Sequence, residues 1–422
     1  MRKFSLSRKF TLNGIFTYVA LFCVATFALL EHTSVSISAF SSVKLPLMYL
    51  GMLCIVAQIK TISRCVFKKK YFFVLLAVVA FCFLLFLTIF TNRGGNLGGT
   101  PLYSTVRLIL YLIEMFLLMI VLAETGRAKA AINFLFWYYV AIAVVNDALM
   151  FSRLLTFGTA RHESYIVGSK FSVAYLHMNL LTFWSIRSQW HNRKKLPTWI
   201  VLLAAAFIIG MAVRVDCMTG IVGCVALVFL FGLVESPKRK KLIRFTSANL
   251  LMLVLGASVL FVVVAETLIE MPLVQFVVEN VFERDATLTG RTKIFKMFFE
   301  VIEGNWLDGY GYGNGNIVTT TLMGYANVQN ALLQWVLQVG IMGTAGLVVV
   351  MYTVFRQIQR KRLRNMDMIL PLVALIYMYI FLGSVETTFN MAFILWFGLI
   401  FMMVNERQPQ LPESQTAVRA RQ

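Results

Sequence analysis

The chain has 422 residues, of which 59% are hydrophobic and only 14% are charged, and its mean hydropathy is +0.76. Soluble domains carry about a quarter charged residues, so this composition excludes a water-soluble globular fold and predicts that a bilayer solvates most of the surface. The formal net charge of +20 comes from short clusters of Lys and Arg between apolar runs, where an anionic leaflet attracts them. We therefore expect no nucleic-acid partner.

The sequence predicts neither a metal site nor a cofactor. Its six cysteines lie in or beside apolar runs and include no CxxC pair, so they indicate neither a disulfide framework nor a zinc site. The glycine-rich stretch near residue 310 lacks the GK[ST] ending of a phosphate-binding loop, which disfavours nucleotide hydrolysis.

Repeated apolar runs predict an all-α, polytopic transmembrane bundle of about twelve spans. About 20 apolar residues in a helix are long enough to cross the hydrocarbon core. A helix is required because lipid offers no hydrogen-bond partner to the backbone. We treat residues 1–422 as one membrane domain. For the first span, a cleaved signal peptide with a site at Ser36-Ile37-Ser38 is the alternative interpretation. The spans are placed at Leu12–Leu30, Leu45–Ile62, Tyr71–Phe90, Ser104–Ala123, Ala131–Phe151, Phe171–Ile186, Trp199–Val213, Thr219–Val234, Ala248–Ala265, Ala331–Phe355, Met368–Gly383 and Met391–Val404.

The basic residues predict the orientation, because Lys and Arg in short loops are retained on the cytoplasmic side during insertion. Most of the 39 lysines and arginines fall in alternate loops and at the two ends of the chain. An even number of spans with both termini in the cytoplasm is therefore expected, and residues 405–422 are expected to be a cytoplasmic tail without stable structure.

One connection is long, and residues 266–330 are expected to join the ninth and tenth spans on the extracytoplasmic side. Val274–Val281 and Ile294–Ile302 are too short and too charged to cross, and both patterns are typical of amphipathic helices at the interface. These helices either line an entrance for a lipid-linked substrate or act as a packing lid. The second is expected to present one apolar face made of Ile294, Phe295, Phe298, Phe299 and Ile302.

Arg291 is a candidate for binding an anion. It follows Thr289-Gly290 and precedes a helix expected to begin near Lys293, where free backbone N–H groups and the positive helix end attract anions. A guanidinium also binds phosphate oxygens in a bidentate fashion. The alternative is that Arg291 pairs with Glu283, Asp285 or a lipid head group.

Alternate glycines between Gly309 and Gly315 surround two tyrosines in the same loop. The glycines permit a sharply folded backbone, and Tyr310 and Tyr312 can present flat faces to sugar rings. A glycine-rich turn is often purely structural, and both interpretations stay open.

Two pairs of ionisable residues fall at or inside predicted spans. Arg214 and Asp216 lie at the outer mouth of the seventh and eighth spans, where ionisable groups are expensive and a function or a specific partner is expected. Arg107 and Glu114 are seven residues apart and share one face of the fourth span. Glu114 is interpreted first as a structural partner.

The third outer loop adds a further polar cluster. Within it, His162 or Glu163 is a candidate general base, although an exposed loop histidine is more often inert. The cluster consists of Arg161, His162, Glu163 and Lys170.

Four segments follow one another in an order that is more specific than any of them alone. They are Thr289-Gly290-Arg291, Gly309-Tyr310-Gly311-Tyr312-Gly313, Val328-Gln329-Asn330-Ala331-Leu332 and Gly340-Ile341-Met342-Gly343. In this order the chain resembles the O-antigen polymerase and O-antigen ligase superfamily over about Asp285 to Gly343. The resemblance implies a fold similar to that of GT-C glycosyltransferases and a glycan transfer without metal or cofactor.

Two positions depart from the pattern of that superfamily. Gln329 occupies the place of the family histidine beside Asn330, and glutamine orients a hydroxyl but does not take its proton at neutral pH. Met218 replaces a basic residue, and Arg214 one helical turn earlier is expected to reach the same region. The missing histidine favours the polymerase branch over the ligase branch. It leaves the general base open among His162, Glu163, Asp216 and Asp285.

The resemblance implies a polysaccharide polymerase that acts on O-antigen, capsule or exopolysaccharide repeat units in the cytoplasmic membrane of a bacterium. Its partners are expected to be a polyprenyl-pyrophosphate-linked oligosaccharide and membrane lipid, and binding of a chain-length regulator or another assembly protein is left open. From the residues and the resemblance together, we predict as catalytic residues Arg291, Arg214, Asp216, His162 and Glu163, and as substrate-binding residues Arg107, Arg161, Tyr310, Tyr312, Gln329 and Asn330.

Two alternatives remain. An O-antigen ligase delivers finished polymer to another acceptor and is distinguished by whether repeats still polymerise in its absence. The second alternative is a transporter or flippase for a lipid-linked sugar. Transporters usually show internal repeats with broken helices in matching positions of the two halves, and this sequence contains no convincing repeat of that kind.

Overall fold

The structure is a computed structural model that describes residues 12–29, 40–91, 100–152, 165–192, 195–235, 244–269, 271–272, 291–360 and 366–407. Within these ranges the chain forms helices joined by turns, with no strand. The helices are α1 (Leu12–Leu29), α3 (Phe40–Val56), α4 (Ile59–Val66), α5 (Lys69–Thr91), α6 (Pro101–Glu124), α7 (Ala128–Ser152), α8 (Lys170–Asn192), α9 (Thr198–Arg214), α10 (Met218–Glu235), α12 (Ala248–Ile269), α14 (Arg291–Ile302), α15 (Gly315–Val318), the π-helix η4 (Thr319–Met323), α16 (Ala331–Arg360), α17 (Met366–Leu382) and α18 (Met391–Asn405).

The helices indicate an α-helical membrane protein, and a helix occupies each position where a span was expected. By length and composition, α1, α5, α6, α7 and α16 are able to cross a membrane, and the bent pair α3–α4 adds a sixth if it counts as one span. The helices α9, α10, α12, α17 and α18 are apolar but shorter. The total of twelve spans and the orientation of the termini therefore stay predictions.

The second expected span, Leu45–Ile62, is not one straight helix. The chain bends by 72° between α3 and α4. The buried side chain of Gln58 lies at the bend, where its amide donates to the Cys54 carbonyl and its Oε1 accepts a hydrogen bond from Thr17. The physical reason for the bend is polarity, because α4 exposes Lys60 and Arg64 and a straight continuation would carry both cations into hydrocarbon.

The expected helix at residues 331–355 forms as α16, but it is broken at Gly340. Gly340 adopts φ 64° and ψ −175°, which only glycine adopts without strain. The loop before α16 fills the break, since the Ile341 amide donates to the Trp306 carbonyl at 2.8 Å and the Tyr310 amide donates to the Leu337 carbonyl at 2.8 Å. The break therefore fixes the glycine-rich loop against α16.

The helix α14 begins at Arg291, two residues before its expected start. Four of the five residues expected on its apolar face are buried, whereas Phe299 is exposed. The buried face is covered by protein, in a small second core that includes Val262 of α12, Met323 of η4 and Leu337 of α16. The other expected amphipathic helix, Val274–Val281, lies outside the described residues.

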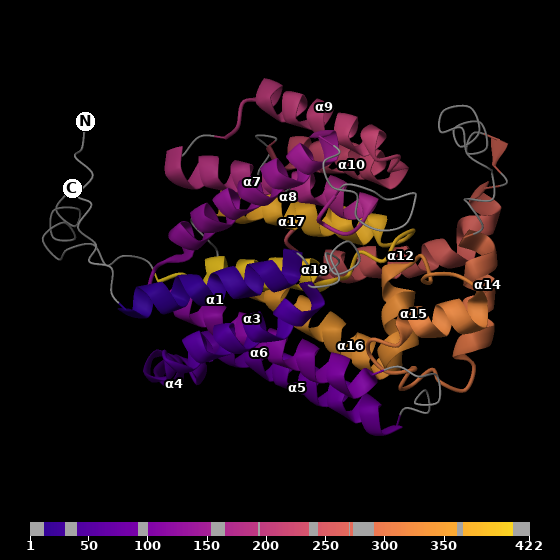
Figure 1. Cartoon of the computed structure of the whole chain (residues 1–422), viewed down its shortest axis with the longest axis horizontal. Helices are drawn as coiled ribbons and strands as arrows, with labels where there is room; N and C mark the ends of the chain where they lie inside the picture. Colours follow the sequence, from indigo (N-terminus) through magenta and orange to yellow (C-terminus); the bar gives the residue numbers. More distant parts are fainter. Residues whose placement is uncertain are drawn as a thin grey trace, which may run out of the picture.

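Loops that were expected on the same side of the membrane meet in the structure. At one end, Lys68 and Lys70 contact Glu124 at 2.9 and 2.8 Å. At the other end, the start of α14 meets the connection between α17 and α18. Figure 1 shows the long helices side by side, with α4 at one end of the bundle and α14 and α15 at the opposite end.

Candidate functional site

Arg291 and Glu386 form an ion pair at the α14 end of the bundle. Nη2 of Arg291 lies 2.9 Å from Oε1 of Glu386, and Nε of Arg291 donates to the Val385 carbonyl at 3.1 Å. The two side chains are only 17% and 6% exposed. Because a buried charge without a partner is costly, this pairing is what allows Arg291 to be held at the start of α14.

The short connection that carries Glu386 is fixed on both sides. The Ala331 amide donates to the Gly383 carbonyl at 2.8 Å, and the Trp335 indole donates to the Phe389 carbonyl at 2.9 Å. At its end the Asn390 side chain accepts from the Phe393 amide and thereby caps α18. These contacts to α16 and α18 hold the Glu386 carboxylate in place before any ligand binds.

Burial and the charge of Arg291 change the pKa of Glu386 in opposite directions. Burial raises the pKa of its carboxyl above the ordinary value, and the neighbouring Arg291 guanidinium opposes that rise. Thr219 at the start of α10 lies with its hydroxyl 3.5 Å from Oε1 of Glu386. The carboxylate is thus more basic than that of an exposed glutamate while it remains hydrogen-bonded.

Lys170 and Asp216 bring a second ion pair to the same end of the bundle. Nζ of Lys170 donates to the main-chain carbonyl of Asp216 at 2.8 Å and lies 3.6 Å from its Oδ2. Asp216 adopts a left-handed backbone conformation with φ 50° in the turn between α9 and α10. Lys170 and Glu386 both act electrostatically on the thiol of Cys217, the next residue after Asp216, and Lys170 also acts on the Glu386 carboxylate.

Two further groups near the pair limit the chemistry that is possible there. The Tyr175 hydroxyl of α8 is buried, interacts electrostatically with Glu386 and Arg291, and has no hydrogen-bond partner within the described part of the chain. Burial raises the pKa of the Cys217 thiol to about 11, so Cys217 is not a thiolate nucleophile. The arrangement therefore offers anion binding by a guanidinium and proton acceptance by a carboxylate.

Arg214 lies two residues before Asp216 at the end of α9, and it is exposed. Its expected contribution beside Arg291 stays a prediction. The expected local partners of Arg291 were Glu283 and Asp285, which lie outside the described residues; the contact that the structure shows is with Glu386.

The tyrosines of the glycine-rich loop make protein contacts. The Tyr310 hydroxyl donates to the Val301 carbonyl at 2.6 Å, and its ring packs on the second core. The ring of Tyr312 lies 5.5 Å from that of Trp335 and packs against the main core. Gly309, Gly311 and Gly313 all have positive φ, which confirms the sharply folded backbone.

Asn330 joins three elements. Its Oδ1 accepts from the Leu333 amide in the first turn of α16, and its Nδ2 donates to the carbonyls of Ser384 and Ser258 at 3.2 and 3.4 Å. Gln329, directly before it, is half-buried and has a positive φ of 56°. Asn330 therefore has a structural function, and a contact of either residue with substrate stays a prediction.

Arg107 lies half-buried on α6, with its guanidinium over the rings of Phe27 and Tyr103 at 5.8 and 5.5 Å. Its Nε is buried without a hydrogen-bond partner in the described part of the chain. Three other candidates, Arg161, His162 and Glu163, lie outside the described residues, as does Asp285.

Glu386 is the residue that the sequence pattern did not single out. It stands in Gly383-Ser384-Val385-Glu386-Thr387-Thr388, a short polar connection between two apolar helices. The rule that drew attention to Arg214 and Asp216, an ionisable group at the membrane edge, applies equally to Glu386. Its pairing with Arg291 spans 95 residues and is visible only in the structure.

Comparisons with protein families, with curated proteins and with solved structures find no match for this chain.

Proposed function

We propose that this chain is a polysaccharide polymerase, which transfers a glycan from its polyprenyl-pyrophosphate carrier to a hydroxyl of a second lipid-linked repeat unit. The observation that carries the proposal is the Arg291–Glu386 pair, which holds a guanidinium, a group suited to binding a diphosphate, 2.9 Å from a carboxylate at one end of an apolar bundle. The order of the motifs around Arg291, which resembles the O-antigen polymerase and ligase superfamily, adds support.

In the proposed step, the acceptor hydroxyl oxygen forms a bond to the anomeric carbon of the donor glycan. The bond from that carbon to the carrier phosphate breaks with its electron pair, and the diphosphate leaves as an anion stabilised by Arg291. The hydroxyl proton passes to the Glu386 carboxylate. The diphosphate competes for the guanidinium, and this competition releases the carboxylate to act as a base.

Glu386 thereby takes the role that the sequence left open among His162, Glu163, Asp216 and Asp285. Burial raises the pKa of Glu386, which makes it a better match to proton transfer near neutral pH than an exposed glutamate. The reaction is proposed to occur at the extracytoplasmic face of a bacterial cytoplasmic membrane, without metal or cofactor and with both termini in the cytoplasm.

The test is a gel of surface glycan from a strain that lacks this protein, complemented with wild type or single variants. We expect wild type to restore long chains, and Arg291→Ala and Glu386→Gln to leave single repeat units. Arg187→Ala is the matched control, because Arg187 is also a half-buried arginine but contacts Asn133 and the ring of Phe136 on α7. Membrane levels of each variant are compared by immunoblot.

Normal chain lengths in Arg291→Ala at a wild-type protein level contradict the proposal. Long polymer that still forms on the carrier in the deletion strain identifies a ligase. Repeat units that stay on the cytoplasmic side identify a transporter.

A further inference from the structure

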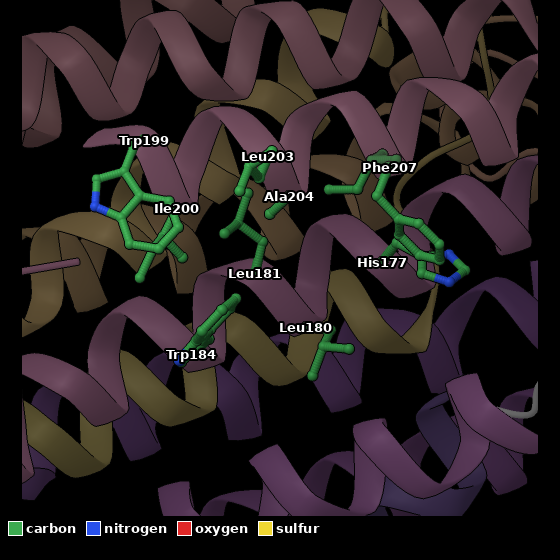
Figure 2. A pocket seen from close by; sticks show the side chains of 10 residues that line it. His177, Leu180, Leu181, Trp184, Trp199, Ile200, Leu203, Ala204 and Phe207 are labelled. Atoms are coloured by element: carbon green, nitrogen blue, oxygen red, sulfur yellow. The ribbon is translucent and has the colours of Figure 1, made fainter. Parts of the chain in front are cut away.

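A groove lies between α8 and α9, in a part of the chain that is expected to cross the membrane. Its volume is about 430 Å³, it is open along one side, and its walls are aliphatic and aromatic apart from His177. Figure 2 shows Trp184 and Trp199 toward one end of the groove and His177 and Phe207 toward the other. In a bilayer, the open side of such a groove meets apolar chains.

Both helices carry a cation two turns beyond the end of the groove at which His177 and Phe207 lie. Residues seven apart on a helix are separated by about 10.5 Å along its axis and point within about 20° of one another. On α8 this step leads from His177 back to Lys170, and on α9 it leads from Phe207 forward to Arg214. Lys170 is half-buried and Arg214 is exposed. The helix faces that line the groove therefore continue to two cations.

These two cations lie at the same mouth of the groove. Lys170 contacts Asp216, which follows Arg214 by only two residues in the chain. Asp216 is the acidic group at this mouth, but its carboxylate lies 3.6 Å from Nζ of Lys170 and its side chain is 66% exposed. Ion pairs that are exposed to solvent are weak. A ligand with several negative charges is therefore able to compete with Asp216 for Lys170.

The mouth of the groove adjoins the Arg291–Glu386 pair. Lys170 acts electrostatically on the Glu386 carboxylate. Tyr175, which is five residues after Lys170 on α8, interacts electrostatically with both Glu386 and Arg291. The groove therefore leads from the lipid to the candidate site, with Lys170 and Arg214 where the two meet.

We propose that the groove between α8 and α9 binds the isoprenoid chain of the polyprenyl-diphosphate carrier, and that Lys170 and Arg214 hold the diphosphate at its mouth and present it to Arg291. This assignment rests on the proposed transferase function, which supplies the carrier. An amphiphile fits because its apolar chain contacts apolar walls while its anionic head meets cations at the membrane edge. A diphosphate has more negative charge to offer these three cations than the single phosphate of a phospholipid.

The test is photo-cross-linking of the purified full-length chain in detergent. The probe is a polyprenyl diphosphate without sugar that carries a diazirine in the half of its chain next to the diphosphate. We expect peptide mass spectrometry to place the cross-links on the groove residues of α8 and α9. Unlabelled polyprenyl diphosphate should displace the probe, whereas equal concentrations of phosphatidylglycerol, with apolar chains and one phosphate, or of inorganic pyrophosphate, without a chain, should not.

Two substitutions of neighbouring leucines on α9 test the apolar part of the site. Leu203 lines the groove and is 62% exposed, so Leu203→Trp adds bulk to the groove without disturbing the core. Leu202 is 55% exposed and is not part of the groove lining, which makes Leu202→Trp the matched control. We expect Leu203→Trp to reduce labelling severalfold and Leu202→Trp to be labelled like wild type.

Substitution of Arg214 tests the charged part of the site. Arg214→Gln should weaken the displacement of the probe by unlabelled polyprenyl diphosphate about fivefold, the size expected for one cation near a membrane surface. Arg187→Gln, which removes a cation near the other end of α8 that contacts Asn133, should leave the displacement unchanged.

Cross-links that map away from α8 and α9 overturn the proposal, as does a probe that phosphatidylglycerol displaces as well as polyprenyl diphosphate does. Equal labelling of Leu203→Trp and Leu202→Trp, or an unchanged displacement in Arg214→Gln, overturns it too. The surface-glycan gel distinguishes these results from a failure of the proposed function. Cross-links in the groove with normal chain lengths in Arg291→Ala overturn the polymerase alone, and cross-links elsewhere with single repeat units in Arg291→Ala overturn the groove alone.

Discussion

Removal of the Arg291 guanidinium is expected to destabilise the protein strongly at neutral pH. The side chains of Arg291 and Glu386 are 17% and 6% exposed, so water does not take over the lost contact. Removal of one partner of a buried pair costs about 3–5 kcal/mol, because the remaining charge is uncompensated. We expect Arg291→Ala to lose an unfolding free energy of that size, well above the loss for Arg187→Ala.

The same loss should shrink on acidification. Burial raises the pKa of Glu386 and Arg291 opposes the rise, so removal of Arg291 lets the pKa move further up. A carboxyl whose pKa is raised in the folded state binds more protons there than in the unfolded chain. Its contribution to stability is therefore greatest at low pH and is lost as the pH rises through the folded-state value. Protonated Glu386 is neutral, so the cost of leaving it without Arg291 falls to that of a neutral polar group.

Equilibrium unfolding at about pH 5 and about pH 9, which together span most of the range documented for buried carboxyls, measures this effect. The double variant Arg291→Ala/Glu386→Gln should regain part of the stability at the higher pH, because glutamine has the shape of glutamate without its charge. An Arg291→Ala loss that is equal at both pH values refutes the reasoning. A double variant that is no more stable than Arg291→Ala refutes it too.

Three further predictions use thermal or chemical unfolding of the purified protein. Gly340→Ala and Gly304→Ala both place alanine at positive φ, which costs about 1–2 kcal/mol of unfolding free energy in each variant. Of the two, only the new Cβ at Gly340 collides with the Leu307 carbonyl, so Gly340→Ala should lose at least twice as much unfolding free energy as Gly304→Ala. Equal losses contradict the packing of the loop against α16. Asn330→Ala should lose about 1–2 kcal/mol because it removes the cap of α16, whereas Asn330→Asp keeps the capping oxygen but places a buried carboxylate oxygen against the carbonyls of Ser384 and Ser258 and should lose more; a smaller loss in Asn330→Asp contradicts these contacts. Glu114→Met should gain about 1–3 kcal/mol, because Oε1 of this buried glutamate has no hydrogen-bond partner in the described part of the chain; a loss would contradict this reasoning.

Positions of helices followed from the sequence because one strong constraint, a membrane of fixed thickness, governs them. Each expected span coincides with a helix, except that Leu45–Ile62 divides between α3 and α4, and the apolar face of α14 is correct at four of five positions. The exception, Phe299, follows from geometry: it stands next to Phe298, and neighbouring residues on a helix point about 100° apart. The bend between α3 and α4 was missed because the expected span Leu45–Ile62 was taken as one straight run that includes Lys60, a cation whose placement in hydrocarbon is costly.

The partner of Arg291 was missed for a related reason. Sequence spacing predicts ion pairs only between residues three or four apart on a helix, or within one loop. Such reasoning offered Glu283 and Asp285, whereas the structure pairs Arg291 with Glu386 across 95 residues. A long-range pair depends on where α14 packs in the fold, and the apolar contacts of the second core hold α14 against α12, η4 and α16.

The motifs that carry the family resemblance differ in what they say about function. In the structure, Gly340 breaks α16, Gly309 to Gly313 fold into the break, and Asn330 caps the same helix, so all three have an architectural function. Any protein that holds a loop against a broken helix in this way needs them, whatever reaction it performs. Arg291 is different, since a buried ion pair is often no more stabilising than apolar residues of the same volume. The case for catalysis therefore depends on Arg291 and Glu386: breaking the pair is costly, but a charged pair is not the arrangement that stability alone favours at a buried position.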